Sequence, residues 1–248
     1  MKIGLLIPCT SHERNWNKMT ETYLYNLTIK TFLVHRDEGH QYVFYIGVDE
    51  DDPIFNNRKQ QKKLLNLTKV FKDIEFKFIV LNEKKGYLTK MWNKLFRQAY
   101  IDRCDYFYQC GDDIEFKTSG WVNACIQKLS DNHNIGLTGP INNNNYILTQ
   151  AFVSRLHMEI FGHFFPETII NWGCDDWYNQ VYSPSYLYPL KYHLSVNMGG
   201  APRYIINYNP TFMSNYKENV DELRNNANEQ AKNDRILIQK FIEKHDLI

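Results

Sequence analysis

The sequence predicts a single α/β domain with a mainly parallel central sheet flanked by helices. Strand-like and helix-like segments alternate through the first 115 residues, and acidic turns directly follow two of the apolar strands. The chain has 248 residues, enough for one α/β domain with a substantial core. Hydrophobic residues make up 43% of it and charged residues 23%, which is ordinary for a globular protein.

Charge and hydropathy exclude several classes of function. The formal net charge is +1 and no long basic run is present, which disfavours a general nucleic-acid binder. The apolar run at the N-terminus stops at Pro8, too short for a signal peptide, and no later apolar run is long enough to span a membrane. The five cysteines lack any CxxC spacing, which favours reduced thiols. We therefore expect a cytoplasmic protein.

The first half of the chain is typical of strands that alternate with helices. Apolar runs at 3–8, 42–48, 76–81 and 106–110 indicate four buried strands. Apolar residues recur at helical spacing in the segments between them, at about 19–32, 64–71 and 88–99. This order predicts a mainly parallel sheet with helices on both faces.

The second half is less regular. We expect strands at 135–138 and 147–153 with a loop at 139–145 between them, then a short helix at 155–161 that ends at Gly162. Residues 171–178 are expected to turn into a further helix, and the Tyr-, Pro- and Gly-rich segment 183–210 to be loop. From 220 to the end, an amphipathic helix is predicted with these residues facing inward: Leu223, Ala227, Ala231, Ile238 and Ile242.

An acidic sequence follows the fourth strand. Asp112, Asp113 and Glu115 stand within four residues at the mouth of the predicted sheet, where their carboxylates repel one another unless a cation compensates. Oxygen ligands of this kind suit Mg²⁺ or Mn²⁺, which would bridge to ligand phosphates and neutralise a diphosphate leaving group. The alternative is a solvated acidic turn, since short motifs of this kind are weak signals.

Polar residues also follow the first and second strands. Thr10 to Arg14 come after the first strand and Asp49 after the second. In parallel sheets the ligand crevice lies beyond the carboxyl ends of the strands, so these groups are expected to collect with the acidic sequence at one edge of the sheet.

This order of elements resembles the GT-A glycosyltransferases, which have a Rossmann-like fold, and in particular the inverting family 2-like enzymes. The resemblance covers about residues 1 to 210 and rests on Thr10–Arg14, Asp49 and Asp112-Asp113 after successive strands. It implies a nucleotide-binding half at 1–115, an acceptor-binding half at 116–210 and a C-terminal helix at 211–248. The acidic element of that family, the DxD motif, reads D-D-I-E here, a departure that leaves the roles of its carboxylates open.

The resemblance implies roles for residues around the nucleotide. Asp113 would ligate the metal, with Glu115 a second candidate ligand, and Asp112 would contact the ribose. Asp49 would bind the base, often uracil, although residues 49–53 also read as a simple turn. Thr10, Ser11 and Arg14 match the first nucleotide loop, and the same residues can cap the following helix. Lys85 opens the third helix, where a cation can approach the ligand, or it is solvated surface.

A second acidic pair, Asp175-Asp176, follows a glycine-containing loop. In inverting members of the family the second acid of such a pair deprotonates the acceptor hydroxyl. The match implies that Asp176 is the general base and Asp175 an acceptor-binding residue. The alternative is that both aspartates cap the N-terminus of a helix. Trp172 beside them would stack on a sugar or belong to the core.

Three residues outside these motifs are weaker candidates. The family implies a third metal ligand in a later loop, a position that His193 matches, although a lone histidine is more often structural. Arg203, in the same loop, would reach the diphosphate. His157 is expected to pack in the core or to line the acceptor site.

The sequence thus predicts a metal-dependent glycosyltransferase that transfers a sugar from a nucleotide-sugar, most simply a UDP-sugar, to a glycan or protein acceptor with inversion. A sugar nucleotidyltransferase is the competing enzyme. It is disfavoured because residues 8–12 lack the glycines of a triphosphate-binding loop. A nucleotide- or carbohydrate-binding protein without turnover is the third possibility, favoured if the pair Asp175-Asp176 is salt-bridged away from the cleft.

Overall fold

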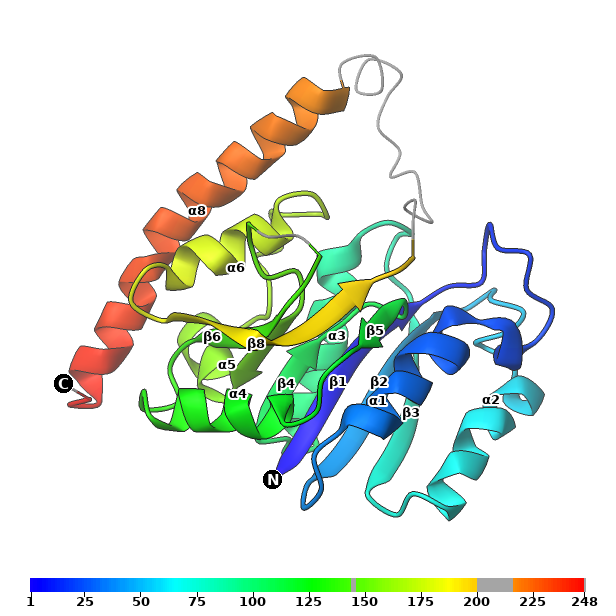
Figure 1. The fold of residues 1–248 in the computed structure, drawn as a ribbon. Helices are drawn as coiled ribbons and strands as arrows, with labels where there is room; N and C mark the ends of the chain where they lie inside the picture. The colour runs from blue at the N-terminus through cyan, green and yellow to red at the C-terminus, as the bar shows by residue number, and fades with distance from the viewer. Residues whose placement is uncertain (144–145, 200–215, 248) are drawn as a thin grey trace.

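The protein is described by a computed structural model that covers residues 1–143, 146–199 and 216–247. These residues form an eight-stranded sheet in the order β3-β2-β1-β4-β7-β6-β8-β5, with helices on both faces (Figure 1). The strands are β1 (Lys2–Cys9), β2 (Gln41–Asp49), β3 (Ile74–Leu81), β4 (Tyr106–Gln109), β5 (Ile114–Phe116), β6 (Leu137–Ile141), β7 (Ala151–Ser154) and β8 (Leu187–Asn197).

The first four strands are parallel, as predicted. β1 pairs with β2 on one side and with β4 on the other, so that Cys9 lies opposite Val48 and Leu6 opposite Gln109. β3 continues the parallel pairing beyond β2. The carboxyl ends of β1, β2 and β4 therefore meet at one edge of the sheet, where the polar residues of the sequence were expected to collect.

Two hydrophobic cores lie on opposite faces of the sheet. One is covered by α3 (Leu88–Ile101), α5 (Leu156–Phe161), α6 (Cys174–Tyr182) and α8 (Tyr216–Lys244). The other is covered by α1 (Lys30–His35), α2 (Arg58–Leu65) and α4 (Trp121–Ser130). Short 3-10 or π-helical turns at η1 (Met19–Glu21), η2 (Leu24–Ile29) and η3 (Asn66–Lys69) complete the connections. The helix predicted at 19–32 is thus three short segments, and only its last part is α-helical.

The second half departs from the sequence prediction in several places. The segment predicted as loop, 183–210, contains the long strand β8, and β6 extends into the predicted loop at 139–145. β8 has no regular alternation of buried and exposed residues; its backbone pairs with β6 and with β5. β7 begins four residues later than the strand predicted at 147–153 and runs antiparallel to β4. The strand β5 and the helix α4 were not predicted.

The N-terminus of α4 is capped by a side chain from a distant segment. Asp37 is buried and its two carboxylate oxygens accept hydrogen bonds from the backbone N–H groups of Gly120 and Asn123, both at 2.8 Å. An acceptor of this kind normally stands next to the helix in sequence. Because this cap is 83 residues away from Gly120, the local sequence does not signal where the helix begins.

The C-terminal helix α8 lies against α6 and α5 (Figure 1). Four of the five residues predicted to face inward, Ala227, Ala231, Ile238 and Ile242, are buried, and Leu223 is partly buried. The indole N–H of Trp177 on α6 donates to Asp234 on α8 at 2.9 Å. Within the described residues, no helix is long and apolar enough to cross a membrane. All five cysteines are buried, and none of them forms a disulfide in the structure.

Replacing Asp37 with alanine is expected to destabilise the protein, because two N–H groups at the start of α4 lose their acceptor. The expected loss is about 1–2 kcal/mol, a fall in melting temperature of about 2–8 °C. Thermal unfolding followed by circular dichroism measures it. The neighbouring exposed Glu38, replaced with alanine, is the control and should melt like wild type; equal melting of both variants contradicts the capping role.

Candidate active site

A cavity of about 490 Å³ lies between the carboxyl end of β4 and the N-terminus of α6. Gly111, next to the acidic pair Asp112-Asp113, lines one side of it, and Asp175 and Asp176 line another. Its walls also include the following residues: Trp92, Gln109, Trp172 and Arg224. Gly111 and Ile114, the residues on either side of Asp112-Asp113, therefore border the same space as Asp175 and Asp176.

Asp175 is placed to accept a proton from a molecule in this cavity. Its Oδ1 accepts a hydrogen bond from the hydroxyl of Tyr178 at 3.0 Å, and Oδ2 has no hydrogen-bond partner among the described residues. Burial raises the pKa of the Asp175 carboxyl to about 7, and the neighbouring charge of Asp176 adds to this. Near neutral pH the group can therefore both take up and release a proton, as a general base must.

Asp176 is held in an ion pair. Arg224 on α8 donates from Nε to both carboxylate oxygens of Asp176, at 3.0 and 3.1 Å, and its Nη2 lies 2.9 Å from Oδ1. A two-oxygen contact of this kind is among the stronger charge-assisted hydrogen bonds. The family resemblance implied that Asp176 is the general base. In the structure, however, both oxygens of Asp176 are paired with Arg224, while Oδ2 of Asp175 forms no ion pair among the described residues.

The carboxylate of Asp113 sits in a cradle formed by glycines. A Cβ added to Gly111 would lie 2.5 Å from Oδ1 of Asp113, and a Cβ on Gly199 would overlap the same carboxylate. The backbone N–H of Met198 donates to the carbonyl of Asp113 at 3.0 Å, which ties the loop after β8 to the acidic loop. Asp112 is fully buried beside it. The cradle fixes Asp113 at the strand edge, where hard oxygen ligands suit a divalent cation.

Arg14 reaches the same loop. Its Nη2 donates to the carbonyl of Gly199 at 3.2 Å, and its guanidinium stands over the rings of Trp16 and Tyr23. Among the described residues its buried Nε has no hydrogen-bond partner. Arg14 is therefore a fixed cation with unused donors near Asp113, a combination that suits an anionic group.

Thr10 and Ser11 are tied to the second strand end by a buried carboxylate. Asp52 accepts from the backbone N–H of Ser11 at 2.6 Å and from its hydroxyl at 2.8 Å, and the Thr10 hydroxyl lies 3.5 Å from Oδ2. The same carboxylate accepts from the N–H groups of Ile54 and Phe55. The hydroxyls of the first loop therefore fix the loop itself, and Asp52 is a structural residue that the sequence reasoning missed.

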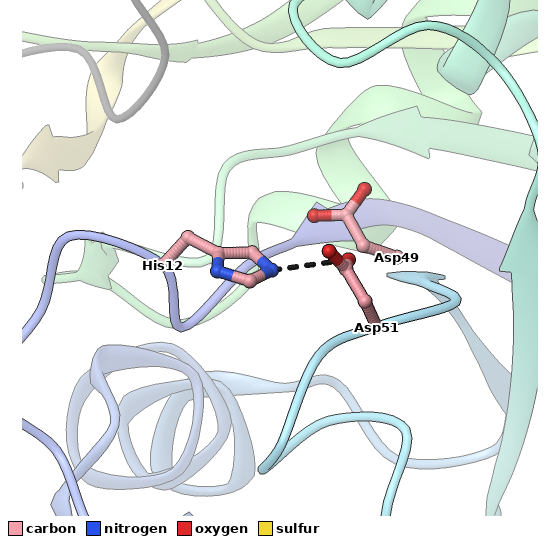
Figure 2. Close-up of side chains that lie close together, drawn as sticks. All are labelled: His12, Asp49 and Asp51. Atoms are coloured by element: carbon pink, nitrogen blue, oxygen red, sulfur yellow. Dashed lines mark hydrogen bonds and ion pairs between the residues drawn. The ribbon is translucent and has the colours of Figure 1, made fainter.

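Asp49 is the last residue of β2 and lies in a polar cluster at the strand edge. Figure 2 shows His12 directed at Asp51, with Nε2 to Oδ1 at 3.1 Å, and Asp49 beside them. Lys85 joins the cluster, with its Nζ 2.7 Å from Asp51 and 3.3 Å from His12. One ligand atom each of His12, Asp49 and Asp51 lie within 4.8 Å of one another, close enough to hold a cation. The positive charge of the Lys85 ammonium already compensates the negative charge of the Asp51 carboxylate in this cluster.

Two of the predicted metal ligands, Glu115 and His193, have other contacts. Glu115 is on β5 and forms an ion pair with Lys117 at 2.5 Å. His193 packs against Gly120 at the start of α4. It stands four residues along β8 from Asn197, which pairs with Ile114, so it is roughly 13 Å from the acidic loop. Arg203 lies outside the described residues.

The structure places the two aromatic candidates differently. Trp172 lines the cavity, in agreement with a contact to a ligand there. His157 is fully buried; its Nδ1 lies 2.7 Å from the hydroxyl of Tyr182 and its Nε2 3.1 Å from the carbonyl of Phe164. Burial lowers the pKa of His157 to about 3, so it is a neutral packing residue.

Comparison with solved structures places this arrangement in a known fold. No protein-family model and no curated protein matches the chain. The structure of S. aureus TarS 1–349 in complex with UDP-GlcNAc is similar at a TM-score of 0.56 and 12% identity, over 99% of this chain and 72% of that one. The UDP complex gives 0.53 and 12%, over 79% of this chain and 60% of TarS 1–349. TarS is a GT-A glycosyltransferase.

This chain has the GT-A fold. At 12% identity the likeness carries the fold and no residue assignment. The predicted fold class is therefore confirmed, including the parallel pairing of the first four strands.

Within the GT-A fold, Gln109 is a cavity residue that no sequence motif marks. It is the last residue of β4 and only 2% exposed. Its Oε1 accepts from the backbone N–H of Ala151 at 3.2 Å. The side-chain amide borders the cavity, so it can donate a hydrogen bond to a ligand oxygen there. A single glutamine at the end of a predicted strand does not by itself indicate a ligand contact, so the sequence could not identify Gln109.

Replacing Asp52 with asparagine is expected to lower the free energy of unfolding by about 2–4 kcal/mol, because several buried donors lose a charged acceptor. Urea denaturation measures the change. Asp51→Asn is the matched control: its carboxylate is exposed, and its solvent-screened ion pair should contribute little to stability. Similar losses in the two variants are the contradictory result.

Replacing Asp175 with asparagine is expected to stabilise the protein increasingly as pH rises. The pKa of this carboxyl in the folded state is raised to about 7. Its ionisation therefore disfavours folding, and the cost grows from about pH 4 to about pH 7. The melting temperature of Asp175→Asn minus that of wild type should be larger at pH 8 than at pH 5, by about 2–4 °C or more. The exposed control Asp131→Asn should show no such trend; a pH-independent difference for Asp175→Asn refutes the raised pKa.

Proposed function

We propose that this protein is a metal-dependent glycosyltransferase that transfers a sugar from a UDP-sugar to an acceptor hydroxyl with inversion at the anomeric carbon. The observation that carries the proposal is the shared cavity on a GT-A fold. Gly111 borders it beside Asp112-Asp113, and Asp175 borders it from the N-terminus of α6. A leaving-group site and a proton acceptor thus face one space large enough for a sugar.

The donor nucleotide would lie along the carboxyl ends of β1, β2 and β4. Asp49, at the end of β2, can accept a hydrogen bond from the uracil ring N–H. Asp112, the predicted ribose contact, is fully buried and supports the acidic loop from beneath. Arg14 has donors for the diphosphate. Asp113 in its glycine cradle is the residue best placed to ligate Mn²⁺ or Mg²⁺, and such an ion would supply charge neutralisation for the leaving diphosphate. Lys85, at the rim, is a further cation for this charge.

The acceptor would enter from the side of α6. Its hydroxyl oxygen attacks the anomeric carbon, the bond from that carbon to the diphosphate oxygen breaks, and UDP leaves with the electron pair. The hydroxyl proton passes to Oδ2 of Asp175. We assign the base to Asp175 because Asp176 is held by Arg224. A single displacement of this kind inverts the anomeric carbon.

The flat and amide-rich walls of the cavity suit a carbohydrate. Trp172 and Trp92 offer aromatic faces, and Gln109 and Asn197 offer amide groups for hydroxyls. A glycan acceptor fits these walls, and the acceptor hydroxyl of a glycosylated protein fits them equally. A role in binding without turnover is less well supported, because Asp175 borders the cavity and forms no ion pair among the described residues.

Replacing Asp113 with alanine is expected to weaken UDP binding in the presence of Mn²⁺ by about 100-fold, or about 2.7 kcal/mol. The reason is the loss of the proposed ligand of the metal that bridges to the diphosphate. Isothermal titration calorimetry with UDP, with MnCl₂ and with EDTA, measures it. Glu115→Gln is the matched control, because that carboxylate is paired with Lys117, and its affinity should stay near wild type. Unchanged affinity of Asp113→Ala would remove the metal assignment.

A further inference from the structure

We propose that Arg224, on the C-terminal helix, is a positioning residue for the catalytic base: it neutralises Asp176 so that Asp175 next to it can ionise in the cavity. This inference rests on the proposed function. It concerns a helix outside the part of the chain that resembles a glycosyltransferase in sequence.

The ion pair joins two helices across the wall of the cavity. Asp176, in the first turn of α6, is 14% exposed, and Arg224, two turns into α8, is 46% exposed. The Arg224 guanidinium forms hydrogen bonds to both carboxylate oxygens of Asp176, with nitrogen–oxygen distances of 2.9 to 3.1 Å. A carboxylate whose two oxygens both accept hydrogen bonds has a fixed orientation. The Asp176 side chain therefore points toward α8, while the adjacent Asp175 accepts a hydrogen bond from the hydroxyl of Tyr178.

The position of α8 is itself fixed close to this ion pair. Gly173, the residue before α6, has φ of +89°, and a Cβ there would lie 2.9 Å from the Cβ of Ala227. Only a glycine allows the two helices to approach this closely. Further along, Trp177 donates to Asp234, and Arg235 donates to the carbonyl of Gln180 at 2.5 Å. These contacts hold Arg224 in register with Asp176.

The charge balance explains what Arg224 does. The ionisable groups around Asp175 are Cys174, Asp176 and Tyr178 on α6, and Arg224 on α8, with Asp221 one turn before Arg224. Asp176 opposes the ionisation of Asp175, and Arg224 favours it. Without Arg224, two adjacent carboxylates would face the cavity and lose the cation that acts on Asp175 among the described residues, so Asp175 would hold its proton to higher pH.

Carboxyl NMR titration tests this directly. The protein is labelled with ¹³C at the aspartate carboxyl carbons, and the Asp175 signal is assigned by its absence in Asp175→Asn. Wild type, Arg224→Gln, Arg224→Lys and the exposed control Lys232→Gln on the same helix are titrated. We expect a midpoint near 7 in wild type, a rise of about one pH unit in Arg224→Gln, and the wild-type value in Arg224→Lys and Lys232→Gln.

Release of UDP from UDP-GlcNAc with Mn²⁺ and water as acceptor gives the functional readout. In Arg224→Gln the pH at half-maximal kcat should rise by about one unit, with the lost rate recovered at higher pH and KM for UDP-GlcNAc unchanged. An Asp175 midpoint and a pH profile that stay at wild-type values in Arg224→Gln would overturn the role of Arg224. Failure of wild type to bind UDP would instead remove the proposed function, so the two failures are distinguishable.

Discussion

Three strands, β1, β2 and β4, are paired in parallel, so their carboxyl ends point to the same edge of the sheet. This alignment decides where every later group of the site stands. It brings the loop at Thr10, the end of β2 at Asp49 and the loop at Asp112 to one edge of the sheet. The buried carboxylate of Asp52 then locks the first two strand ends together through hydrogen bonds to Ser11. Polar groups from distant parts of the chain are held together at this edge because the backbone of the sheet is rigid.

The other side of the cavity is built at some cost in stability. The carboxyl of Asp175 is buried next to that of Asp176, and burial raises the pKa of Asp175 to about 7. Native proteins keep such groups mainly where chemistry needs them. The compensating cation comes from α8, a helix that packs on α6 through small residues and indole and guanidinium hydrogen bonds. The C-terminal helix is thereby part of the proposed active site and not only an addition to the core.

Hydrophobic periodicity was sufficient to predict the first four strands and α3, because each buries a continuous apolar face. It failed for β8, which is a strand because its backbone pairs with β6 and β5. It also failed for α4, whose N-terminus is capped by Asp37 from a distant loop. In the site, the acidic motifs signalled the cavity that Gly111 and Asp175 border. The sequence could not predict which aspartate Arg224 would hold, nor that His193 stands apart from Asp113, since both depend on how α8 and β8 pack. Gln109 and Asp52 carry no motif at all.

Whether the acidic strand edge and the α6 carboxyl serve one substrate can be seen in a crystal structure with UDP-GlcNAc and Mn²⁺. We expect uracil beside Asp49, a metal ion between Asp113 and the diphosphate, and the anomeric carbon in the cavity within reach of Asp175. A nucleotide bound with its diphosphate away from Asp113, or a sugar pointing out of the cavity, would contradict it.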